Sequence, residues 1–145
     1  SRFNQVQQIK SNGRSVIQDR TIYEDAHIFA KNLHQSGLMT TRDYDNYFAL
    51  FESMITMVKA PDLMIYLKAD LPKLIGQIEK RNRDYESSIS INYLRNLNEH
   101  YNTFINNYDK GKLLIIDVNN LDFVANPEDL GSIIEKVQAE LFGLF

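Results

Sequence analysis

Three short apolar runs, separated by segments with helical patterns, constrain the fold of this 145-residue chain more than any other feature. They lie at residues 15–18, 63–67 and 113–117, and we expect each to be a buried strand. Apolar strands that alternate with helices are typical of an α/β fold, in which helices flank a parallel sheet. In such sheets ligands bind beyond the carboxyl ends of the strands. Three strands are few for so many helices, and we expect a further amino-terminal portion to complete the sheet.

Helical periodicity predicts the elements between these strands. One helix ends at Asn12-Gly13. Further helices are expected over residues 22–33, 40–59, 72–81 and 91–108. Asn126 can cap the last helix and Pro127 can open it. Residues 82–90 are polar and lack apolar periodicity, so we expect a loop there.

The composition excludes several kinds of function. With 16 basic and 19 acidic residues the net charge is −3, which argues against binding a nucleic-acid polymer. There is no cysteine, so disulfides, thiol catalysis and zinc–thiolate sites are excluded. No apolar stretch reaches the roughly 20 residues that cross a bilayer, and no signal peptide is apparent, so we expect a cytoplasmic protein. The first residues lack a start methionine and a helix cap, and we expect the chain to begin inside a longer protein.

The first candidate site follows the first expected strand, at Asp19-Arg20-Thr21. A carboxylate at this edge can hold a hydrated magnesium ion, and an arginine can clamp a phosphate or a hydroxyl group. Asp25 lies about one and a half helical turns further on and could line the same cavity. The alternatives are an Asp–Arg surface pair at the strand exit and a solvated helix face.

The second candidate is a basic cluster, in which Arg81 and Arg83 end a helix and enter the polar loop. Arginines on a closing loop can stabilise charge during phosphoryl transfer, and closure excludes water. The alternative is that these cations are favoured at the carboxyl end of the helix by its dipole.

A phosphate-binding loop is absent from these 145 residues, since no G-x-x-x-x-G-K-[ST] pattern occurs. The pair Gly111-Lys112 has no glycine five residues earlier and no Ser or Thr after it. The chain therefore has no evident cradle for the β- and γ-phosphates of a nucleotide.

Taken in order, these motifs resemble those of the deoxynucleoside kinase family. Asp19-Arg20-Thr21 and the helix after it resemble the family's (Glu/Asp)-Arg-Ser motif. The family's next strand, lid, post-lid helix, final strand and adenine-contacting turn are matched by residues 61–69, 81–86, 93–101, 117–119 and 122–123. The resemblance runs from Ser1 to the end and identifies the chain as a single, partial deoxynucleoside kinase domain, with a lid at about residues 81–90.

The resemblance implies a P-loop kinase fold and an enzyme of nucleotide salvage. The reaction would transfer the γ-phosphoryl group of ATP to the 5′-hydroxyl of a deoxynucleoside, with Mg²⁺. Asp19 would help to hold the magnesium ion, and Arg20 would contact the 5′ end of the nucleoside. Arg81 and Arg83 would be the lid arginines on the transferring phosphate.

The remaining roles implied by the resemblance concern recognition of the two substrates. Asp25 would face the substrate base together with Arg2, and Glu86 would bind the sugar 3′-hydroxyl. Asp122 and Phe123 would border the adenine of the donor. An Arg–Asp pair resembles the purine and deoxycytidine branches more than the thymidine branch, and we favour purine deoxynucleosides.

The chain departs from the family pattern at several positions. Gln77 stands where an arginine is frequent, Asn82 replaces the lid glycine, and Leu121 resembles an insertion before the adenine turn. The family's P-loop and its general-base glutamate both lie amino-terminal to Ser1. We therefore expect these residues alone to be inactive.

Two alternative functions remain open, and so does the expected homodimer. The chain could be a non-catalytic interaction module on a kinase scaffold, or part of a deoxycytidine-preferring kinase. In the family, a helix pair at the position of the helix expected over residues 40–59 forms the dimer interface. The resemblance therefore implies a homodimer. Otherwise Tyr47, Phe48, Phe51 and Met54 would simply cover the sheet.

Overall fold

The computed structural model describes residues 2–81 and 89–143. The chain divides into two compact units. The first comprises Ser1–Ala60 and Glu99–Phe104, and the second comprises Pro61–Asn98 and Ile105–Phe145. Across the described residues, no helix is long and apolar enough to cross a membrane.

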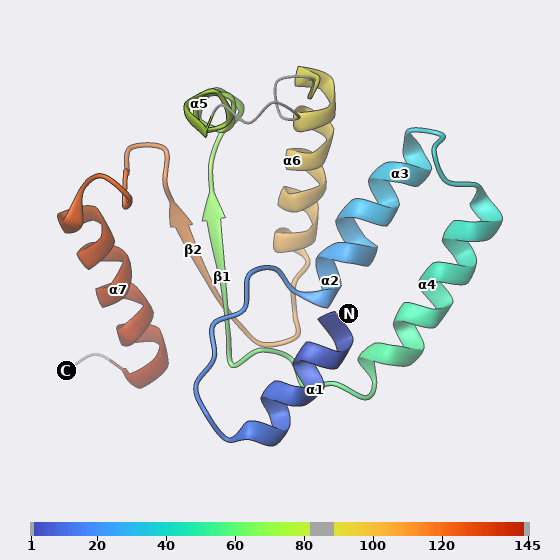
Figure 1. The fold of residues 1–145 in the computed structure, drawn as a ribbon, viewed down its shortest axis with the longest axis horizontal. Coiled ribbons are helices and arrows are strands. Elements are labelled where there is room, and N and C mark those ends of the chain that lie inside the picture. The colour runs from blue at the N-terminus through green and yellow to red at the C-terminus, as the bar shows by residue number, and fades with distance from the viewer. Residues whose placement is uncertain (1, 82–88, 144–145) are drawn as a thin grey trace. The chain divides into compact units, whose positions relative to one another are not determined.

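The second unit is built on a parallel pair of strands (Figure 1). Strand β1 (Leu63–Lys68) pairs with β2 (Lys112–Asp117), with Leu63 opposite Lys112 and Lys68 opposite Asp117. The helix α7 (Pro127–Phe142) lies beside β2 (Figure 1). The core of this unit is Ile116, Ala69 and Val118. Partly buried apolar side chains pack against that core, namely Leu74, Leu114, Leu121, Phe123 and Ile133. Of the three expected strands, the two at residues 63–67 and 113–117 are confirmed, and so is their parallel pairing.

Short-range hydrogen bonds at their amino ends explain where the helices of this unit begin. The Asp70 carboxylate accepts a hydrogen bond from the Lys73 amide (3.1 Å) at the start of α5 (Leu71–Arg81). The Asn126 side chain accepts one from the Glu128 amide (3.1 Å), and Pro127 occupies the first turn of α7. The cap and the proline that the sequence indicated are therefore both confirmed.

The first unit is helical. It contains α1 (Arg2–Asn12), α2 (Ile22–Glu24), the π-helix η1 (Asp25–Ala30), α3 (Lys31–Gln35) and α4 (Thr41–Ile55). Helix α6 (Ile91–Asn106) contributes Glu99–Phe104. Helix α1 ends at Asn12 and is followed by Gly13, whose φ of +62° suits glycine. The helix expected over residues 22–33 is present, but its middle is a π-helix, a form that is rare and is frequently found at functional sites.

Aromatic packing holds the helices of the first unit together. The His27 ring stacks on Phe104 at 5.5 Å between centroids and meets Phe48 and Phe51 edge-on, each at 5.4 Å. Phe48 and Phe51 of α4 therefore pack within their own unit, where both contact His27 of the neighbouring helix η1. Leu50, on the same helix, is 59% exposed.

Several details of the sequence prediction are wrong. Residues 15–18 form no strand, and Ile17 is 97% exposed. A strand needs a hydrogen-bonded neighbour, and in the described part of the chain only β1 and β2 pair. Strand β1 is not buried on both faces, since Ile65 and Leu67 are partly exposed. The helix expected to reach Lys59 ends at Ile55.

Candidate functional site

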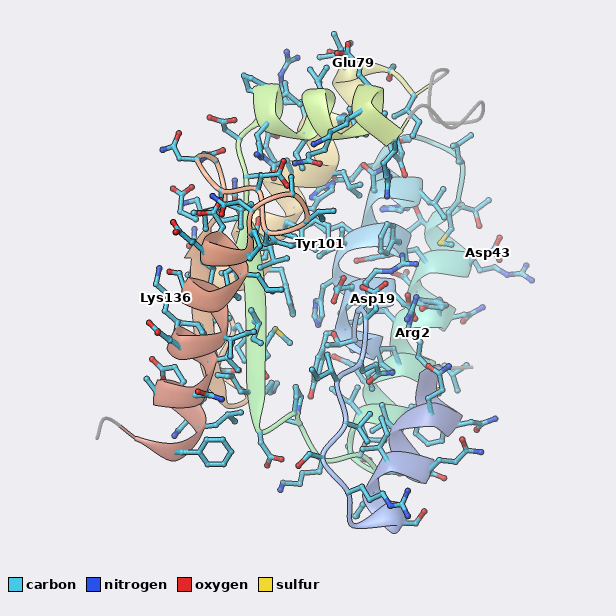
Figure 2. The ribbon with its side chains drawn as sticks, turned by 60° about the vertical axis from the view of Figure 1, so that its left-hand side comes forward. Arg2, Asp19, Asp43, Glu79, Tyr101 and Lys136 are labelled. Carbon is cyan, nitrogen blue, oxygen red and sulfur yellow. The ribbon has the colours of Figure 1, made fainter. Side chains whose placement is uncertain are left out.

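In the first unit, Arg2 contacts two other predicted site residues, Asp19 and Asp25. Its Nη1 donates a hydrogen bond to the backbone oxygen of Asp19 (3.0 Å), and its Nε lies 3.5 Å from Oδ2 of Asp25. Arg2 and Asp19 lie close together in Figure 2. The side chains of Arg2 and Asp25 are 25% and 39% exposed, so this ion pair is accessible to a ligand. Arg2 therefore links the backbone of Asp19 to the carboxylate of Asp25, and the shared cavity expected for the two carboxylates stays a prediction.

Arg20 has an unusual backbone conformation. Its φ is +60°, and it is the one non-glycine residue with positive φ in the described ranges 2–81 and 89–143. For a residue with a Cβ this left-handed conformation costs about 1–2 kcal/mol. Its guanidinium carbon lies 5.2 Å from the centre of the Phe29 ring, which is a cation–π distance. Such strain is frequently found at functional sites, where surrounding contacts maintain it.

The residues after Arg20 form a reciprocal helix cap. The Thr21 hydroxyl accepts a hydrogen bond from the Tyr23 amide (3.2 Å), and the Thr21 amide donates one to Oε1 of Glu24 (2.9 Å). Oε2 of Glu24 accepts a third bond, from the Tyr101 hydroxyl at 2.8 Å. Glu24 is 9% exposed, so it does not lie on a solvated helix face. The Thr-x-x-Glu spacing could have revealed the cap, whereas no sequence signal pointed to Tyr101.

The Asp19 side chain suits a hydrated magnesium ion. It is exposed, and Arg2 bonds the backbone oxygen of Asp19 rather than its carboxylate. Mg²⁺ keeps several waters and uses only one or two protein carboxylates. The described residues contain no group of three or more His, Asp or Glu side chains placed to hold a metal ion. A magnesium ion at Asp19 would therefore take its other ligands from water and substrate oxygens.

Tyr47 on α4 lies near Asp25, and the sequence did not indicate it as a residue of the candidate site. Burial raises the pKa of its phenol, and the negative charge of Asp25 raises it further. The phenol therefore stays protonated at neutral pH, as a hydrogen-bond donor near the Arg2–Asp25 pair.

In the second unit, Asp122 shapes the turn after β2. Its Oδ1 accepts hydrogen bonds from the amides of Ala125 (3.0 Å) and Val124 (3.2 Å), and its Oδ2 lies 3.1 Å from the Lys80 ammonium. The Ala125 amide and then Lys80 hold the pKa of this carboxyl below its ordinary value. The Lys73 ammonium donates to the backbone oxygen of the preceding residue, Leu121 (2.9 Å). Two lysines of α5 therefore fix the turn that was expected to border an adenine.

Of the remaining predicted site residues, the structure describes Phe123 and Arg81 but not Arg83 and Glu86. The Phe123 side chain packs against the Ile116 core and is partly buried. Arg81 is the last residue of α5. Arg83 and Glu86 lie outside the described residues, as does most of the expected lid. The roles assigned to all of these side chains remain predictions.

Comparison with known proteins identifies the family. The family model described as "Deoxynucleoside kinase" matches residues 1–142. This chain therefore belongs to the deoxynucleoside kinase family, as its motifs indicated.

Individual relatives agree with this assignment. A deoxyadenosine kinase of Dictyostelium discoideum is 42% identical over 93% of this chain and 54% of its own length. A deoxyadenosine/deoxycytidine kinase of Bacillus subtilis is 31% identical over 94% of this chain and 64% of its own. The chain thus spans about half to two thirds of the length of these curated relatives.

Solved structures confirm the fold. The deoxyadenosine kinase of M. mycoides with bound dATP superimposes with a TM-score of 0.76 and 29% identity, over 94% of this chain and 68% of that one. The same enzyme with the products dCMP and a flexible dCDP gives a TM-score of 0.78 and 27% identity, over 95% and 68%. The expected α/β, P-loop-kinase-like fold is confirmed.

The lowered pKa of Asp122 leads to a prediction about pH. This carboxylate stabilises the folded turn above the pKa of the unfolded chain, and the contribution is lost as pH falls through the folded-state pKa. We expect the Asp122 carboxyl carbon, followed by NMR, to titrate below the ordinary range of aspartate. Lys80→Ala should raise the midpoint only in part, because the Ala125 amide remains. A midpoint at the ordinary value in the unaltered protein would contradict the turn geometry.

Proposed function

We propose that the complete protein is a kinase that transfers the γ-phosphoryl group of ATP to the 5′-hydroxyl of a deoxynucleoside, with a preference for purines. The observation that carries this proposal is the family match over residues 1–142. Relatives from several organisms are named as deoxyadenosine or deoxyguanosine kinases, which supports the purine preference. We place the enzyme in the cytoplasm, in nucleotide salvage.

The residues of the first unit suit the acceptor side of this reaction. A magnesium ion at Asp19 would neutralise phosphate charge, and the Arg20 guanidinium would meet the 5′ end of the nucleoside. Phosphoryl transfer depends mainly on positioning and charge stabilisation, which fixed side chains of this kind supply. Arg81 and Arg83 would add positive charge from the lid, and Glu86 would bind the 3′-hydroxyl.

The Arg2–Asp25 ion pair suits recognition of a base. Arginine carries five N–H donors, of which one is engaged with the Asp19 backbone oxygen and another faces Asp25. The remaining donors and the Asp25 carboxylate can meet an edge that presents a ring-nitrogen acceptor beside an amino donor. Adenine and cytosine share that edge. On the donor side, the turn that contains Asp122 and Phe123 would border the adenine of ATP.

Deoxycytidine is the second candidate substrate, for a specific reason. The Bacillus subtilis relative is named for both deoxyadenosine and deoxycytidine, and the M. mycoides enzyme was solved with dCMP and with dCTP. The amino and ring-nitrogen edge common to the two bases gives a chemical basis for such dual use.

A substrate panel tests the proposed reaction. The complete protein should phosphorylate deoxyadenosine, deoxyguanosine or deoxycytidine with ATP and Mg²⁺, in a coupled assay for ADP release. These 145 residues alone should be inactive, because they contain no phosphate-binding loop. Activity of the 145 residues would refute the second expectation. Inactivity of the complete protein towards all nucleosides would instead favour an interaction module on a kinase scaffold.

The lid arginines give a mutational prediction. Arg81→Ala or Arg83→Ala in the complete protein should lower kcat by roughly 10²-fold, because charge on the transferring phosphoryl group loses a stabilising cation. The matched control is Lys136→Ala, which removes one exposed positive charge from α7. Steady-state kinetics with saturating ATP measure the effect. An unchanged kcat in both arginine variants would remove the lid assignment.

We also propose a homodimer through α4. Phe48 and Phe51 pack within the first unit, but Leu50 is 59% and Tyr47 36% exposed on the same helix. Light scattering of the complete protein should give twice the monomer mass at micromolar concentration, and Leu50→Glu should shift it toward the monomer. A monomer in the unaltered protein would end this proposal.

A further inference from the structure

We propose that Glu24 and Tyr101 are positioning residues that hold Arg20 in its strained, left-handed conformation. The inference rests on the proposed function, in which the Arg20 guanidinium meets the 5′ end of the nucleoside. Neither residue would touch the substrate. Both would act through Arg20, by fixing the backbone on which it stands and the ring beneath its side chain.

The first line of support concerns the backbone. The Thr21 amide, directly after Arg20, is bound by Oε1 of Glu24 at 2.9 Å. The Asp19 carbonyl, directly before Arg20, is bound by Arg2 at 3.0 Å. The peptide groups on both sides of Arg20 are therefore restrained, and these restraints maintain its unfavourable φ of +60°. Glu24 supplies one of the two.

Glu24 is held in turn by Tyr101. The Tyr101 hydroxyl donates to Oε2 of Glu24 at 2.8 Å, across 77 residues of sequence. Because Glu24 as a whole is only 9% exposed, its carboxylate can rotate little once both of its oxygens are bonded. Helix capping alone would need only Oε1, so the second bond adds orientation to the cap.

The second line of support concerns the Arg20 side chain. Its guanidinium carbon lies 5.2 Å from the centre of the Phe29 ring. Phe29 is met edge-on by the ring of Tyr101, with centroids 6.5 Å apart and planes at 89°. Tyr101 therefore supports Arg20 twice, through Glu24 to its backbone and through Phe29 to its guanidinium (Tyr101 is labelled in Figure 2).

Kinetics of the complete protein test the positioning role. Tyr101→Phe removes the hydroxyl and keeps the ring, and Tyr93→Phe on the same helix is the matched control. We expect Tyr101→Phe to lower kcat about tenfold with KM for the nucleoside changed less than about twofold, since misplaced charge weakens the transition state. In an Arg20→Lys background the same substitution should have little further effect, because both changes act through one group. An unchanged kcat, or an equal loss in both backgrounds, would overturn the proposal.

Hydrogen exchange supplies a readout that does not depend on activity. The Thr21 amide should exchange about tenfold faster in Tyr101→Phe than in Tyr93→Phe, while the Ile116 amide in β2 serves as a reference for global stability. If exchange accelerates equally at the Thr21 and Ile116 amides, Tyr101 contributes only to global stability and the proposal is overturned. Unchanged exchange at Thr21 would overturn it as well. If the unaltered protein phosphorylates no nucleoside, the proposed function fails, and the exchange rates still decide whether Tyr101 restrains the loop.

Discussion

The left-handed backbone of Arg20 is the constraint on which the candidate site of the first unit depends. A residue with a Cβ does not keep φ at +60° without compensation. Here the compensation comes from both neighbouring residues, through Arg2 to the Asp19 carbonyl and through Glu24 to the Thr21 amide. Arg20 would relax towards an ordinary conformation without these bonds, and its guanidinium would leave the Phe29 ring. Asp19 and Arg20 therefore owe their placement to side chains that carry no reactive chemistry themselves.

In the second unit, side-chain hydrogen bonds also hold the backbone, at the turn after β2. The Asp122 carboxylate bonds two amides of its own turn and one lysine of α5, and a second lysine holds the Leu121 carbonyl. Asp122 was expected to border an adenine, which stays a prediction, and both of its carboxylate oxygens are bonded within the second unit. In the folded chain its contribution to a nucleotide site would be to fix the shape of the turn.

How much of this could be read from the sequence depends on whether the signal is local. The cap at Asn126, the proline after it and the apolar runs of β1 and β2 are local, and they were predicted correctly. Residues 15–18 contain the β-branched pair Val16 and Ile17, but a strand also needs a partner, which composition does not reveal. The family motifs pointed to Asp19, Arg20 and Asp25, whereas Tyr101 was missed because its bond to Glu24 spans 77 residues. No short-range pattern encodes such a contact.

Arg2 adds a link between the two tasks that the proposed function requires of the first unit. One of its nitrogens faces the Asp25 carboxylate, which would read the base, and another holds the carbonyl of Asp19, which would hold the metal. A base that competes for Asp25 changes the electrostatic environment of the same guanidinium that restrains Asp19. Under the proposed function, recognition of the base and placement of the phosphate-binding groups would therefore both depend on the Arg2 side chain.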